Sequence, residues 1–96
     1  MSHRLPDLVL WLADSSLPVA IVLDRWQRSL RRQRADLQGW RTAIAAGRYA
    51  QVRYQTGHVL VTRLRQLAAG VGLAPPQFIA GEDVTASELI LPAVSP

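Results

Sequence analysis

The chain has 96 residues, carries a formal net charge of +4 and contains no cysteine. This length suits one small domain rather than two. Without cysteine the protein has no disulfide, no thiol nucleophile and no cysteine-based zinc site. Since 49% of the residues are hydrophobic, we expect residues 1–96 to form a single small domain rather than a disordered chain, with 70–96 a loop-rich tail.

The first residues do not resemble a secretory signal, and the most apolar stretch, residues 8–23, is interrupted by Asp14 and Pro18. We therefore expect a cytoplasmic protein. All eleven basic residues are arginine, whose codons are rich in G and C, and this usage suggests a bacterial, phage or plasmid source. Residues 1–65 hold these arginines against four aspartates, whereas residues 66–96 hold three acids and no base. Such asymmetry indicates a polyanionic partner or contact between the two ends of the chain.

Apolar residues near the N-terminus follow the helical spacing i, i+3, i+4 and i+7: Leu5, Leu8, Val9 and Leu12. This spacing predicts a short N-terminal helix. Leu10 and Trp11 make the run apolar on all sides, which a buried strand would also do. An α+β alternative therefore stays open, in which residues 8–12 and 19–23 form an N-terminal β-hairpin before an arginine-rich helix.

A long heptad helix is expected over about residues 18–46. Its apolar seam follows the a and d positions: Val19, Leu23, Trp26, Leu30, Leu37, Trp40 and Ile44. Gln33 is the one polar member of the seam, and Gly47 is a natural helix terminator. Two tryptophans are bulky for a slim coiled coil, so they favour packing within a compact bundle.

Residues 48–69 are expected to return antiparallel to the long helix, because the segment that ends this stretch is helix-prone. A β-hairpin over residues 51–62 is the alternative, since Val52 and Tyr54 alternate ahead of a turn signal at Gly57. The leading fold is thus all-α, a helical hairpin or small bundle. In the tail, Thr85 and Glu88 have the spacing of a capping box.

Residues 67–82 resemble the helix-turn-helix of the Cro/phage-repressor family. Ala68 and Gly72 match the small residues of that motif, and its apolar positions are matched by Leu67, Val71, Leu73 and Phe78. The resemblance implies that residues 75–82 form a reading helix, in which Gln77 would face base edges. This segment contains no arginine.

The arginines of the long helix lie opposite its apolar seam. The candidate polyanion-binding residues are Arg25, Arg28, Arg31 and Arg32, and Arg34, Arg41 and Arg48 follow one flank at intervals of seven. One interpretation is a strip that tracks phosphates, which predicts DNA or RNA as a partner. The other is the solvated outer face that any amphipathic helix needs. A membrane surface is not the partner we expect, because tryptophans at heptad positions are typical of a core.

The seam supplies the leading functional hypothesis, a non-enzymatic regulatory or adaptor protein that acts through helix-mediated contact with itself or another protein. Its candidate partner-binding residues are Leu23, Trp26, Leu30, Leu37, Trp40 and Ile44. The alternative is a small basic nucleic-acid-binding regulator. No catalytic motif is present, and His3 and His58 lack metal-ligand spacing. We therefore expect no enzyme activity, no metal, no cofactor and no small-molecule substrate.

Overall fold

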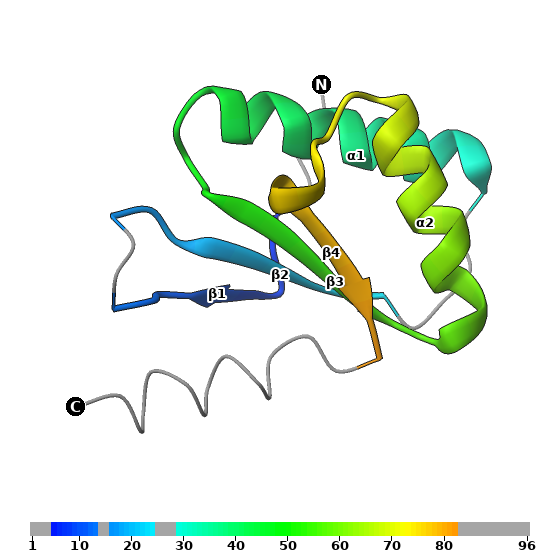
Figure 1. Ribbon diagram of the computed structural model, residues 1–96, viewed down its shortest axis with the longest axis horizontal. Coiled ribbons are helices and arrows are strands. Elements are labelled where there is room, and N and C mark those ends of the chain that lie inside the picture. The colour runs from blue at the N-terminus through cyan, green and yellow to red at the C-terminus, as the bar shows by residue number, and fades with distance from the viewer. Residues whose placement is uncertain (1–4, 14–15, 25–28, 83–96) are drawn as a thin grey trace.

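The computed structural model describes residues 5–13, 16–24 and 29–82. In these ranges the elements are β1 (Leu8–Leu10), β2 (Val19–Asp24), α1 (Leu30–Ala45), β3 (Gln51–Thr56), α2 (His58–Gly70), the 3-10 turn η1 (Pro75–Gln77) and β4 (Phe78–Gly81). The strands form one sheet in the order β1-β2-β3-β4 (Figure 1). β1 is antiparallel to β2, and β2, β3 and β4 are parallel.

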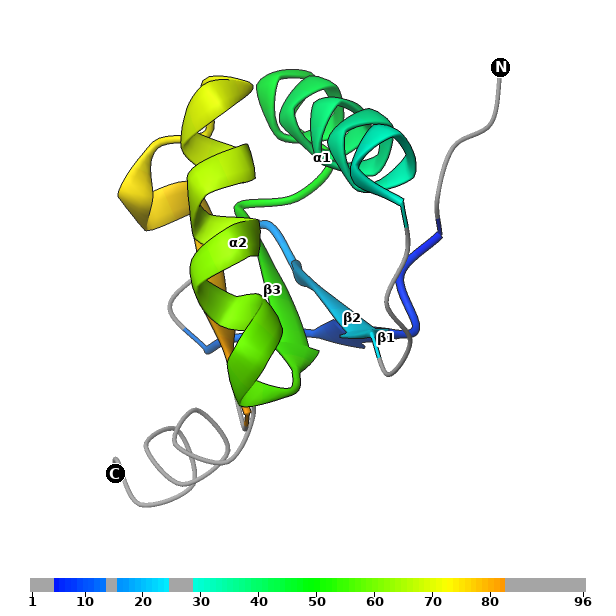
Figure 2. The same ribbon diagram turned by 90° about the vertical axis from the view of Figure 1, so that its right-hand side faces the viewer.

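Both helices cover the same face of the sheet. α1 joins β2 to its parallel neighbour β3, and α2 with η1 joins β3 to β4, so each helix is the crossover of a β-α-β unit. Figures 1 and 2 show α1 and α2 over one face, and no described helix lies over the other face. Each helix returns against the strand direction, so the helix N-termini lie at the end of the sheet where the parallel strands finish.

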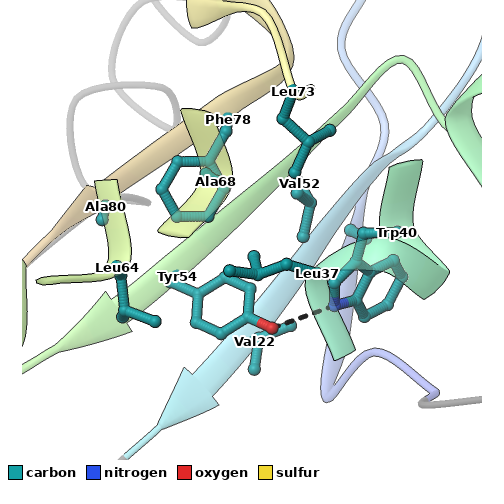
Figure 3. Close-up of a cluster of buried hydrophobic side chains, with 11 residues drawn as sticks. Val22, Leu37, Trp40, Val52, Tyr54, Leu64, Ala68, Leu73, Phe78 and Ala80 are labelled. Atoms are coloured by element: carbon teal, nitrogen blue, oxygen red, sulfur yellow. Dashed lines mark hydrogen bonds between the residues drawn. The ribbon is translucent and has the colours of Figure 1, made fainter. Parts of the chain in front are cut away.

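The core fills the space between this sheet face and the two helices (Figure 3). Along β3, Val52 and Tyr54 face the core and Arg53 faces the other side, because successive side chains of a strand alternate. Trp40 Nε1 donates a hydrogen bond to the Tyr54 hydroxyl at 3.1 Å, which gives the indole a buried partner. The buried members of this cluster are Ala20, Val22, Leu37, Trp40, Val52, Tyr54, Leu64, Ala68, Leu73, Phe78 and Ala80.

The all-α prediction is wrong, because residues 19–24 form strand β2 and not the first turns of a long helix. Val19, Ile21 and Val22 are β-branched, and a continuous apolar run of this kind is typical of a parallel strand buried on both faces. The heptad spacing matched this run because the whole of 19–23 is apolar. α1 begins at Leu30, where the Ser29 hydroxyl accepts a hydrogen bond from the Arg32 amide at 3.2 Å.

The predicted end of this helix is confirmed. α1 finishes at Ala45, and Gly47 has a φ of 79°, a left-handed conformation that favours glycine.

The N-terminal β-hairpin of the α+β alternative is confirmed, and the short N-terminal helix is wrong. β1 pairs with β2 so that Leu8 lies opposite Ile21 and Leu10 opposite Val19. The pairing of two apolar runs through the sheet decided between two local patterns that the sequence supported equally.

Residues 48–69 form neither an unbroken helix nor a hairpin over 51–62. They contain β3, then Gly57 as the N-cap, then α2. The alternating residues before Gly57 and the helix-prone residues after it each form the element that their local pattern favours.

Part of the expected loop-rich tail belongs to the sheet. Residues 75–82, for which the family resemblance implies a reading helix, contain η1 and then β4 at the sheet edge. Phe78 and Ala80 alternate into the core from this strand. The residues with capping-box spacing, Thr85 and Glu88, lie outside the described residues.

Within the described ranges, neither helix combines the length and the apolar character that crossing a membrane would require.

Candidate anion-binding surface

The end of the sheet where β2, β3 and β4 finish collects the N-termini of both helices (Figure 2). In open α/β sheets this edge is the usual position of a ligand. Backbone N–H groups and the helix dipole place partial positive charge at a helix N-terminus. The first turns of α1 and α2 contain no acid that would neutralise this charge.

The outward side of α1 carries a second source of positive charge. Arg31, Arg32, Arg34 and Arg41 are all exposed, because Leu37 and Trp40 turn the opposite side of the helix toward the sheet. At about 100° per residue, Arg34 and Arg41 share one flank. That flank faces α2, since a Cβ added to Gly72, just beyond α2, would meet Arg41 Nε at 3.0 Å.

Arg63 faces this flank from α2. Two residues along a helix are separated by about 200°, so Arg63 and Arg65 lie on opposite sides of α2. Arg65 lies on the β4 side, where its Nη2 donates a hydrogen bond to the Ala80 carbonyl at 3.2 Å. Arg63 therefore lies on the α1 side, and its buried Nε has no hydrogen-bond partner in the part of the chain that the structure describes.

Acids are absent from these facing flanks within the described residues. α2 contains none, and the one acid of α1 is Asp36. Asp36 lies about 200° from Arg34 around the helix, on the flank that lines a small cavity with Leu5 and Tyr49. Arg34, Arg41 and Arg63 are thus assigned to the facing flanks of the two helices, and these flanks carry no carboxylate within the described residues.

Beneath this end of the helices the core contains an orphaned polar layer, formed by Gln33 and Thr56. Gln33 is 2% exposed and Thr56 6% exposed. Gln33 Nε2, Gln33 Oε1 and Thr56 Oγ1 are buried, and none of them has a hydrogen-bond partner among the described residues. A buried polar group left in this state costs about 1–3 kcal/mol.

The two residues occupy the same level of the fold. Leu37 and Tyr54 lie together in the core (Figure 3). Gln33 is one turn before Leu37, about 6 Å along α1, and Thr56 is two residues beyond Tyr54, about 6.6 Å along β3. Because α1 and β3 run in opposite directions, both steps lead toward the edge that holds the helix N-termini.

The structure exposes two of the predicted polyanion-binding residues, Arg31 and Arg32, and places Arg34 and Arg41 on the flank of α1 that faces α2. Arg25 and Arg28 lie outside the described residues. Arg63 was missed, because only the packing of α2 against α1 brings it near the other arginines. Gln33 was visible in the sequence as the polar interruption of the seam, whereas nothing local marked Thr56.

The predicted partner-binding seam is used inside the molecule. Leu37 and Trp40 are 0% and 2% exposed and pack on the sheet, so a partner cannot reach them. Ile44 is partly buried against the same core. Leu23 belongs to β2, Leu30 is 52% exposed at the start of α1, and Trp26 lies outside the described residues.

A separate groove of about 270 Å³ lies between α2 and β4 and is lined by Ala68 and Phe78 among others. Arg65 is its one charged residue, and this side chain already donates to Ala80. The groove is therefore a weaker candidate for anion binding than the facing flanks of α1 and α2. In the part of the chain that the structure describes, no group of histidines and acids could hold a metal ion.

No protein-family model matches this chain, and no curated protein and no solved structure matches it. The chemistry of the surface is therefore inferred from its own residues and geometry.

Proposed function

We propose that the protein binds nucleic acid without catalysing a reaction, through an arginine face formed by Arg31, Arg34 and Arg41 of α1 and Arg63 of α2. The observation that carries this proposal is that the facing flanks of α1 and α2 carry arginines and, within the described residues, no acid. Guanidinium groups suit phosphate because their planar fork of donors matches its oxygens. Contacts of this kind position a protein on the backbone of a nucleic acid and do not read its sequence.

The dimensions of the arginine face suit an extended polyanion better than a single phosphate. Arg31 and Arg41 are ten residues apart, which corresponds to about 15 Å along α1. Successive phosphates of one DNA strand rise by about 3.4 Å, so this length spans about four nucleotides. The N-terminus of α1 adds partial positive charge at one end of this face.

The orphaned polar layer supports a functional role for this end of the molecule. Buried groups without partners lower stability, and proteins retain such costs chiefly where function needs them. Gln33 and Thr56 lie below the N-terminal turns that adjoin the arginine face.

Salt dependence tests the proposal quantitatively. Each phosphate contact contributes about −0.9 to the slope of log K against log salt on duplex DNA, so four arginines predict a slope of about −3.6. Raising NaCl from about 50 to about 200 mM should then weaken binding roughly 150-fold. Fluorescence anisotropy with a labelled duplex and with a labelled RNA of mixed sequence measures this slope.

A matched pair of variants locates the contacts. Arg34→Gln/Arg41→Gln removes two charges from the arginine face and should reduce the slope by about 2. Arg48→Gln/Arg65→Gln removes the same charge elsewhere and should leave the slope unchanged. Equal effects of the two double variants, or no binding of wild type to either probe at low salt, would refute the proposal. Circular dichroism confirms that each variant is folded.

Self-association through β1 is a second proposal, supported by apolar residues exposed at this edge of the sheet. Val9 is 45% exposed and Trp11 67% exposed. An exposed apolar edge strand is a template for another strand, and a two-fold axis would pair β1 with β1 of a second copy. Sedimentation velocity of wild type and of Val9→Lys tests this, with a dimer expected for wild type alone. A monomeric wild type at every concentration would contradict it.

A further inference from the structure

The sheet face opposite the helices is deeply buried at its centre. By strand alternation Val19 and Ile21 of β2 and Arg53 of β3 point to this face, because their neighbours Ala20, Val22, Val52 and Tyr54 belong to the helix-covered core. Val19 is 2% exposed, Ile21 1% and Arg53 4%. Figures 1 and 2 show both helices on the other side, so no described helix accounts for this burial.

Side chains of this face are more exposed on the edge strands than on the central strands. Arg53 lies in register between Ile21 of β2 and Ile79 of β4. Ile79 on the edge strand is 38% exposed, and Leu8 on the opposite edge strand is 52% exposed. Neighbouring strands can cover the stem of Arg53, but the outer end of a side chain that stands on a sheet is covered only by something above it. Neither described helix supplies such a cover over β2 and β3.

We propose that the C-terminal segment, residues 83–96, docks across this sheet face. The segments outside the described residues are 1–4, 14–15, 25–28 and 83–96. Three strand spacings of about 4.8 Å give a width of about 14 Å for this sheet, which nine helical residues or about five extended residues can cross. The C-terminal segment has that length, and it follows directly on β4 at the sheet edge.

The composition of the C-terminal segment complements the sheet face. Its apolar run Leu89, Ile90 and Leu91 suits Val19 and Ile21, since burial of aliphatic side chains drives association. Its ionisable side chains, Asp83 and Glu88, are all acidic. A buried guanidinium such as that of Arg53 is stabilised by an acid, and Arg53 Nε already donates to Gln51 Oε1 at 2.6 Å on this face. The acidic end and the arginine-rich part of the chain would thus meet across the sheet.

Disulfide trapping in the full chain tests the docking, because the protein has no cysteine of its own. Ile79→Cys places a thiol on the proposed sheet face, and Val59→Cys, 86% exposed on α2, places one on the opposite side of the sheet as the matched control. Each is combined in turn with Leu89→Cys, Ile90→Cys or Leu91→Cys. Mild oxidation followed by mass spectrometry and a non-reducing gel separates intramolecular from intermolecular disulfides.

We expect at least one Ile79→Cys combination to form an intramolecular disulfide about tenfold faster than its Val59→Cys counterpart, because docking raises the effective concentration of the two thiols. Intermolecular disulfides from the Ile79→Cys combinations would show that a second copy covers this face and would overturn the proposal. Equal rates for the two sets would overturn it as well.

Hydrogen exchange of the unmodified protein supplies a measurement that does not depend on how the variants fold. Amides of residues 89–91 should exchange at least tenfold more slowly than in the free peptide. Exchange at the free-peptide rate would overturn the proposal. Neither experiment involves nucleic acid, so its outcome is separate from that of the binding proposal.

Discussion

Replacing Gln33 with methionine tests the orphaned polar layer directly. Gln33 is 2% exposed, and within the described ranges neither its Nε2 nor its Oε1 has a hydrogen-bond partner. A buried polar group without a partner costs about 1–3 kcal/mol. A methionine of similar length has no such group and adapts well to a packed core. We therefore expect Gln33→Met to raise the free energy of unfolding by about 2 kcal/mol.

Urea denaturation measures this difference, and the slope of the unfolding free energy against urea should not change, because the surface exposed on unfolding stays nearly the same. For a domain of this size, about 2 kcal/mol corresponds to a rise of roughly 8–16 °C in melting temperature. Gln38→Met makes the same change at an exposed position of α1 and should stay within about 0.5 kcal/mol of wild type. A destabilised Gln33→Met would mean that Gln33 makes hydrogen bonds in the folded protein, which would refute the reasoning.

Three further stability changes follow from the fold, each measured by denaturation. Tyr54→Phe removes the acceptor of the Trp40 indole and should cost about 1–3 kcal/mol, and a neutral effect would argue against that bond. Gly39→Ala should stabilise α1 by up to about 1 kcal/mol, since its added Cβ meets nothing within 4 Å. Gly47→Ala also meets open space but has a φ of 79°, so it should cost about 1–2 kcal/mol. Equal effects of the two alanines would exclude backbone conformation as the cause.

The arginine face and the proposed docking site of the C-terminal segment lie on opposite sides of the sheet. The arginine face belongs to the helix layer, and the proposed docking site of the C-terminal segment belongs to the other side. Docking of that segment would cover an apolar sheet face without obstructing the arginine face. The uneven charge of the chain would then have two uses, since the arginines of α1 face outward and the buried Arg53 would face the docked acidic segment.

Some of the candidate site could be found from the sequence because the signal was local. The outward position of Arg31 and Arg32 follows from the apolar residues that face inward on the same helix, and the structure exposes both. Arg63 could not be found in this way, because its proximity to Arg34 and Arg41 depends on two helices that are separated by β3. Thr56 could not be found either, because its burial depends on which part of the fold covers the last residue of β3.

The sequence by itself determined the features that act within one element: the amphipathic helix that ends before Gly47, the alternation of β3, and the uneven charge of the chain. Only the tertiary structure decided whether residues 8–10 and 19–24 are helix or strand. An apolar run without polar interruption has no hydrophobic periodicity that would distinguish a helix from a strand. Its conformation is set by which neighbouring segment can satisfy its backbone hydrogen bonds. For β1 that neighbour is β2, and for β2 it is also β3, which lies about thirty residues further along the chain and could be identified only once the chain had folded.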